Sequence, residues 1–129
     1  MLKRIISSIY LALAFRSYRR DNMASSRYYV DKHFGYSNRK NATARAFSGT
    51  LYLLDKDMEK ARNEFKTAAQ NVKDNDGADA RYVSLYCDYY LCLINEEVDC
   101  DRMRRLALEV PASRNMKRWL QLADKPVDS

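Results

Sequence analysis

The sequence predicts an all-α protein built from repeated helical hairpins. Glycine and proline, which interrupt helices, occur only three and two times in the 129 residues, whereas alanine, leucine, lysine, arginine and glutamate are plentiful. Pairs of small residues about twelve positions apart also recur about every 37 to 39 residues. These pairs are Ala12 with Ala24, Gly49 with Ala61, and Cys87 with Cys100. We interpret each pair as the point where the two helices of a hairpin touch.

The expected helices form a single domain over residues 1–129. Three hairpins cover about residues 2–34, 41–74 and 79–110, and a C-terminal capping helix covers about 113–124. The individual helices are expected over Leu2–Tyr18, Asn22–His33, Asn41–Leu53, Met58–Lys73, Asp79–Asn95, Cys100–Glu109 and Ser113–Ala123.

The first hairpin begins with a helix that is apolar on almost every side between Ile5 and Phe15. One neighbouring helix cannot cover such a surface, so we expect a homodimer contact, an obligate partner or a membrane surface, with the homodimer favoured. No apolar run reaches the roughly 20 residues that a membrane-spanning helix requires. The second helix should bury Tyr28 and end at Gly35, which supplies a left-handed stop.

The first twenty residues also have features of a targeting signal, because they contain basic residues, an apolar stretch and no acidic residue. We favour an integral first helix and a cytoplasmic protein. Export, or membrane association through this segment, is the alternative.

The central hairpin carries the strongest pattern. Gly49 and Ala61 are small enough for two antiparallel helices to approach closely, while Tyr52 and Phe65 fill the space on either side. Residues 58–73 place apolar side chains at intervals of three and four with charged residues opposite, which indicates an amphipathic helix.

The third hairpin departs from the pattern at several positions. Cys87 and Cys100 occupy the two small positions, so their side chains should lie near each other. Proximity permits a disulfide, but two reduced cysteines that act as small packing residues are favoured. Arg104 stands where a large apolar residue is expected, so Met103 and Leu106 should fill that space.

Aspartate and serine residues are placed to cap the later helices by accepting hydrogen bonds from free backbone amides. Asp55 or Asp57 should cap the fourth helix, Asp99 or Asp101 the sixth, and Ser113 the seventh. The seventh helix has one apolar face, and we expect that face to cover the exposed edge of the last hairpin.

The stretch from Ala44 to Ala69, with Gly49, Tyr52, Ala61, Phe65 and Ala68 at helical-hairpin spacing, resembles a tetratricopeptide repeat. The resemblance implies a right-handed superhelical stack of about three hairpins, whose first helices line a concave groove that binds a protein partner or peptide. The implied groove residues are Ile9, Leu13, Arg16, Ala46, Thr50, Leu53, Leu54, Ser84, Asp88 and Leu91. The groove lacks the lysine and asparagine side chains that grip chaperone tails, and its apolar character suits an amphipathic helix or an apolar segment. Alternatively, the groove is filled by another copy of the chain, is otherwise occupied, or is merely solvated.

The sequence does not predict an enzyme. It has one histidine, no glycine-rich phosphate loop and no nucleophile with an evident base. We therefore expect no catalytic residues, no cofactor and no metal site. Three cysteines without a CxxC pair also do not match a structural zinc site.

Nucleic-acid binding is the alternative function. Residues 1–45 contain ten basic and two acidic residues, interleaved with aromatic side chains that could stack on bases. The basic patch comprises Arg16, Arg19, Arg20, Arg27, Lys32, Arg39, Lys40 and Arg45.

Overall fold

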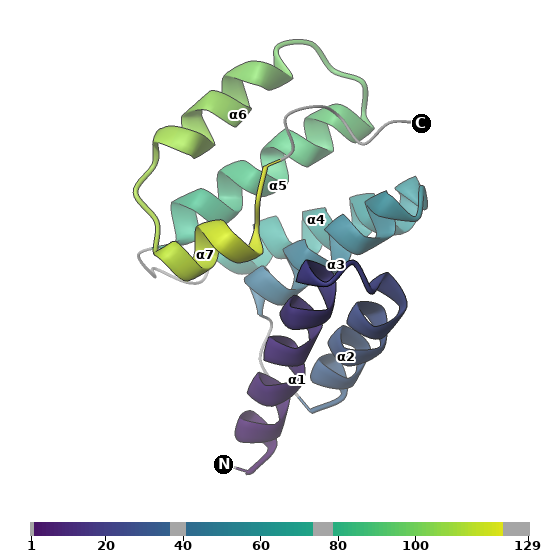
Figure 1. Ribbon diagram of the computed structural model, residues 1–129. Coiled ribbons are helices and arrows are strands. Elements are labelled where there is room, and N and C mark those ends of the chain that lie inside the picture. Colours follow the sequence, from purple (N-terminus) through teal and green to yellow (C-terminus); the bar gives the residue numbers. More distant parts are fainter. Residues whose placement is uncertain (1, 37–40, 74–78, 123–129) are drawn as a thin grey trace.

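The computed structural model of the protein describes residues 2–36, 41–73 and 79–122 (Figure 1). Within these ranges there are seven helices and no strand, which confirms the predicted all-α class. The helices are α1 (Leu2–Arg19), α2 (Met23–Tyr36), α3 (Ala42–Leu54), α4 (Met58–Lys73), α5 (Ala80–Ile94), α6 (Cys100–Glu109) and α7 (Arg114–Trp119).

The first six helices pair in chain order as the hairpins α1–α2, α3–α4 and α5–α6, and α4 packs against α5 (Figure 1). Among these six helices, neighbours in sequence are therefore neighbours in space. The buried apolar residues of all three hairpins and of α7 form one hydrophobic cluster.

The three hairpins share one turn geometry. Asp21, Lys56 and Glu96 each adopt a left-handed backbone, with φ of 59°, 61° and 55°. In each turn this residue donates its N–H to the carbonyl three positions back, and the next residue donates to the carbonyl five positions back. This pattern is the Schellman motif, which satisfies the free carbonyls at a helix end. The same backbone solution therefore recurs three times along the chain.

In the first hairpin, α1 and α2 touch at residues two positions later in the sequence than predicted. Ala14 and Ser26 are fully buried, and the Ser26 hydroxyl donates to the Ala14 carbonyl oxygen at 2.8 Å. The predicted pair, Ala12 and Ala24, is exposed. The turn at Asp21 fixes which residues face each other across the hairpin, and it selects Ala14 over the equally small Ala12.

Two further expectations for α2 are corrected. Val30 is fully buried, whereas Tyr28, predicted as a core residue, is 55% exposed. Gly35 lies within α2, which continues to Tyr36, so it is not a left-handed stop. A helical glycine at this position needs no special backbone conformation.

The close approach predicted in the central hairpin is confirmed. A Cβ atom added to Gly49 would lie 2.9 Å from the Phe65 ring, so only glycine lets the helices approach this closely. Ala61 and Phe65 are both fully buried. The Phe65 ring also stacks on Tyr90 of α5, with ring centroids 5.4 Å apart and planes 9° apart. Phe65 thus links α3, α4 and α5.

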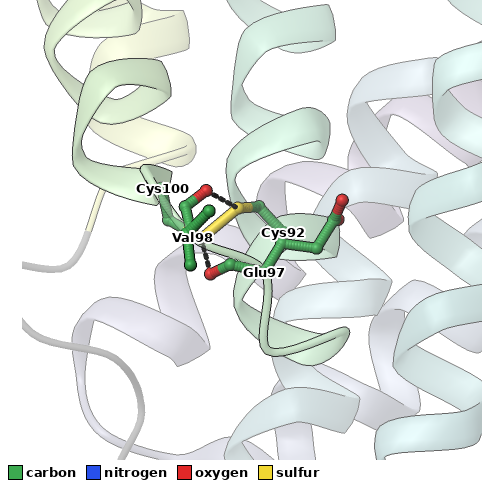
Figure 2. Close-up of a disulfide and its surroundings, with 4 residues drawn as sticks. All are labelled: Cys92, Glu97, Val98 and Cys100. Carbon is green, nitrogen blue, oxygen red and sulfur yellow. Dashed lines mark hydrogen bonds between the residues drawn. A yellow bond between two sulfur atoms is a disulfide. The ribbon is translucent and has the colours of Figure 1, made fainter.

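The arrangement of the three cysteines differs from the prediction. Cys100 forms a disulfide with Cys92, with Cα atoms 5.7 Å apart, and Cys87 is a buried free thiol (Figure 2). The turn at Glu96 brings Cys92 and Cys100 to the same level on either side of it. Cys87 lies about 7.5 Å further along the axis of α5. The expectation that Cys87 and Cys100 meet, both reduced, was wrong.

The packing of α6 differs from the prediction as well. Ala107 is fully buried and Met103 packs on the core, but Leu106 is 37% exposed. Asp99 adopts a left-handed backbone with φ of 64° and makes no side-chain capping bond. In α4, by contrast, the predicted cap forms because Asp57 accepts from the Lys60 N–H at 3.2 Å.

None of the helices in the described ranges combines the length and the apolar character needed to cross a membrane.

Exchanging Gly49 for alanine should destabilise the fold. The new methyl group would collide with a Phe65 ring that is held against Tyr90, and we expect the free energy of unfolding to fall by about 1 to 2 kcal/mol. Gly35→Ala is the matched control. Nothing lies within 4 Å of its added Cβ, so it should stabilise the protein by about 0.5 kcal/mol. Urea denaturation measures both, and equal shifts would contradict this packing.

The cysteine assignment predicts a thiol count. Denatured but unreduced protein should show one reactive thiol per chain, and three after reduction. Cys92→Ser should lower the free energy of unfolding by about 2 kcal/mol because the closed loop is released in the unfolded chain. Three thiols before reduction would contradict the disulfide.

Candidate functional site

Helix α7 lies across the first helices of the hairpins. Trp119 stacks on Phe15 of α1, with ring centroids 4.4 Å apart and planes 6° apart. On α3, the Thr43 hydroxyl donates to the Met116 sulfur at 3.7 Å. These contacts place α7 on the helices predicted to line the groove. Contacts with Tyr82 and Asp79 of the last hairpin add to those on α1 and α3.

Two tyrosines of α5 bind the end of α7. The Tyr82 hydroxyl donates to the Leu120 carbonyl oxygen, and Leu120 is fully buried. The Tyr90 hydroxyl donates more weakly to the Gln121 carbonyl at 3.5 Å. Both acceptors are backbone carbonyls at or just beyond the helix end, where no intrahelical donor remains. The tyrosines therefore act as a side-chain cap for α7.

The start of α7 is held by Asp79, the N-cap residue of α5. The Asp79 carboxylate, which precedes α5, accepts from the Ser113 N–H at 2.7 Å and from the Ser113 hydroxyl at 2.9 Å. The Ser113 oxygen accepts in turn from the Met116 N–H at 3.1 Å, which confirms the predicted N-cap. Both ends of α7 are thus held by α5.

The sequence of α7 explains which side faces inward. Met116, Trp119 and Leu120 lie at intervals of three and four and are turned toward the protein, whereas Lys117 and Arg118 are exposed. A helix of six residues is too short to be stable alone in water. Its helical state therefore depends on the face beneath it.

The residues predicted to line the groove fall into three groups. Ala46, Thr50 and Leu53 are buried in the core, and the Thr50 hydroxyl bonds to that of Tyr86. Ile9, Arg16, Leu54 and Asp88 are exposed, and Leu13, Ser84 and Leu91 are half-buried. The prediction missed Phe15, Thr43 and Tyr82, which contact α7 directly. Apart from their place on the first helices of the hairpins, no sequence signal distinguishes them.

The buried tyrosines and the free cysteine of α5 are uncharged at neutral pH. Burial raises the pKa of Tyr82 to about 12. Burial, and then the neighbouring Tyr90, raise the pKa of Tyr86 well above its ordinary value, although its bond with Thr50 acts in the opposite direction. Burial also raises the pKa of the Cys87 thiol. The face thus offers α7 apolar surface, two tyrosine hydroxyl donors and the Asp79 carboxylate.

Two members of the predicted basic patch are used inside the fold. The Arg27 guanidinium donates to the Ser48 hydroxyl at 2.9 Å and to its carbonyl at 3.1 Å, and lies 3.8 Å from the centre of the Tyr52 ring. Arg45 lies 4.0 Å from the centre of the Phe34 ring. Both arginines join α2 to α3.

Arg45 also pairs with Glu64 of α4 at 3.2 Å. Arg16, Arg19, Arg20 and Lys32 are exposed, while Arg39 and Lys40 lie outside the described residues. The structure therefore does not gather the eight basic residues into one free patch.

Among the described residues, no group of three or more histidine, cysteine, aspartate and glutamate side chains is placed to hold a metal ion. The single histidine, His33, is buried between α1 and α2, with its Nδ1 atom 2.7 Å from the Ser7 carbonyl oxygen. This contact gives His33 a packing role in the first hairpin.

Comparison with protein-family models, curated proteins and solved structures finds no match for this chain. The most specific arrangement among its own residues is the seating of α7 on α1, α3 and α5.

The raised pKa of Tyr82 makes the docking of α7 sensitive to alkali. Because the folded-state pKa of about 12 exceeds the ordinary value of 10.0, the stabilisation is complete below pH 10 and is lost as the pH rises toward 12. Fluorescence of Trp119, the only tryptophan, should report release of α7 across this interval.

Tyr82→Phe keeps the ring but removes the ionising hydroxyl, so it should move the alkaline transition to higher pH. Tyr28→Phe, at an exposed position, is the control and should leave the transition unchanged. Identical alkaline profiles for the two variants would show that Tyr82 does not govern the docking.

Proposed function

We propose that the chain is a tetratricopeptide-like interaction module, without enzymatic activity, that binds a helical segment of a partner protein on the face formed by α1, α3 and α5. The observation that carries this proposal is the seating of α7 on that face, through Trp119 on Phe15 and Tyr82 on the Leu120 carbonyl. A face that holds one short helix of this chain has the shape and chemistry to hold another.

The repeated architecture supports the same proposal. The three hairpins share one Schellman turn, and the central hairpin has Gly49 against Phe65 at the expected close contact. We propose that the hairpins belong to a single right-handed superhelical domain of this kind. In such a domain the first helices of successive hairpins lie on one side and provide a continuous binding surface.

The contacts of α7 define the partner segment. It should carry large apolar side chains at positions corresponding to Met116, Trp119 and Leu120, at intervals of three and four. It should also end at the α5 tyrosines, because Tyr82 and Tyr90 donate to backbone carbonyls at a helix end. A short amphipathic helix with a free C-terminal end satisfies both requirements.

Nucleic-acid binding is less well supported. Arg27 and Arg45, which belong to the predicted patch, already bind Ser48 and Glu64 within the fold. A side chain engaged in this way must break internal contacts before it can neutralise a phosphate.

The disulfide changes the argument about compartment. A bond between Cys92 and Cys100 is more typical of an oxidising environment than of the cytoplasm. The disulfide therefore supports the alternative of an exported or membrane-associated protein that retains α1, because Phe15 of α1 is part of the core.

The proposal is tested with a variant in which α7 is released. Trp119→Ala combined with Leu120→Ala removes the ring stack and a fully buried side chain. A fluorescent peptide of residues 111–122 should bind this variant at least about tenfold more tightly than the wild type, because the tethered α7 no longer competes. Anisotropy titration measures both affinities.

Leu108→Glu, at an exposed position on α6, is the matched control and should leave the wild-type affinity unchanged. Equal affinity for the wild type and the released variant would contradict a helix-binding face.

A further inference from the structure

The outer side of α1 carries a strip of exposed apolar residues. Leu2, Ile5 and Ile9 are 70%, 53% and 54% exposed, and Ala12 is also exposed. Their spacing of three and four places them on one face of the helix. The buried residue Ala14 lies on the opposite face, against α2. The strip therefore takes no part in the packing of the first hairpin.

The strip lies among positive charges. It ends at Arg16, Arg19 and Arg20, and Lys3 and Arg4 lie near its N-terminal end on the other side of the helix; all five are exposed. Helix α1 contains no acidic residue. An apolar face on a helix whose charged side chains are all basic is the pattern of a helix that lies in the boundary between lipid headgroups and acyl chains.

We propose that the outer face of α1 docks on an anionic lipid surface, independently of the partner-binding face beneath α7. The side chains of Leu2, Ile5 and Ile9 enter the headgroup boundary, and the arginines lie against the negative lipid headgroups. The strip from Leu2 to Ala12 spans about 15 Å along the helix axis, which suits a helix lying in the plane of the surface.

Charge disfavours a second copy of the chain as the occupant. If two strips pack in parallel, the arginine clusters of both copies meet. If they pack antiparallel, Arg16 of each copy lies against the exposed Leu2 and Ile5 of the other, where no acidic residue can pair with it. Neither arrangement gives the arginines an opposite charge, whereas a negative surface complements Arg16, Arg19 and Arg20.

The position of α1 leaves the strip accessible. Figure 1 shows the N-terminal half of α1 extending away from α5, α6 and α7, with α2 along one side. A flat surface can therefore approach the outer face of α1 at the end of the hairpin array without displacing another helix.

The test is co-sedimentation of the full chain with lipid vesicles. The protein should bind vesicles that contain phosphatidylserine, bind weakly to phosphatidylcholine alone, and dissociate as salt is raised. The triple variant Arg16→Gln, Arg19→Gln, Arg20→Gln should lower the vesicle partition coefficient about a hundredfold, because each lost charge lowers it roughly fivefold. Ile5→Glu with Ile9→Glu should abolish it.

The matched control is Leu106→Glu with Leu108→Glu, two substitutions at exposed apolar positions of α6, which should bind like the wild type. Circular dichroism verifies that each variant remains folded. The proposal is overturned if anionic vesicles are not bound, if neutral vesicles are bound equally, or if the α6 variant loses as much binding. It is also overturned if sedimentation velocity shows a dimer that Ile5→Glu with Ile9→Glu converts to a monomer.

Discussion

The arrangement of the helices depends on the contact between Gly49 and the ring of Phe65. The absence of a side chain at Gly49 lets the ring enter the interface between α3 and α4, and the other side of the ring stacks on Tyr90 of α5. A single side chain thereby sets the spacing within the central hairpin and its position against the third. The side of α3 and α5 that receives α7 follows from this spacing.

The face of the first helices combines apolar surface with hydroxyl donors in a way that suits a helix end. Trp119 stacks on Phe15, while Tyr82 satisfies a carbonyl that the short helix leaves without an internal donor. Because α7 is too short to be stable alone, its docking couples local helix formation to occupancy of the face. The chain therefore contains a bound helix as part of its own fold, and the partner segment that we propose must compete with it.

The sequence predicted the fold class and the central contact because both depend on local patterns, such as the spacing of Gly49 and Phe65. It misplaced the contacts in the outer hairpins because these depend on where the turns fall. Asp21 and Glu96 adopt left-handed backbones without being glycine, so no residue type marked them. The docking of α7 was not predictable either, since its apolar face does not specify which surface Trp119 will meet.

The most direct test of a face occupied by α7 is the proximity of two rings in solution. Nuclear Overhauser spectroscopy of the full chain should show contacts between the Trp119 indole and the Phe15 ring, whose centroids are 4.4 Å apart. Excess peptide of residues 111–122 should weaken these contacts as it displaces α7. An indole without contacts to Phe15, in protein that is otherwise folded, would contradict the account.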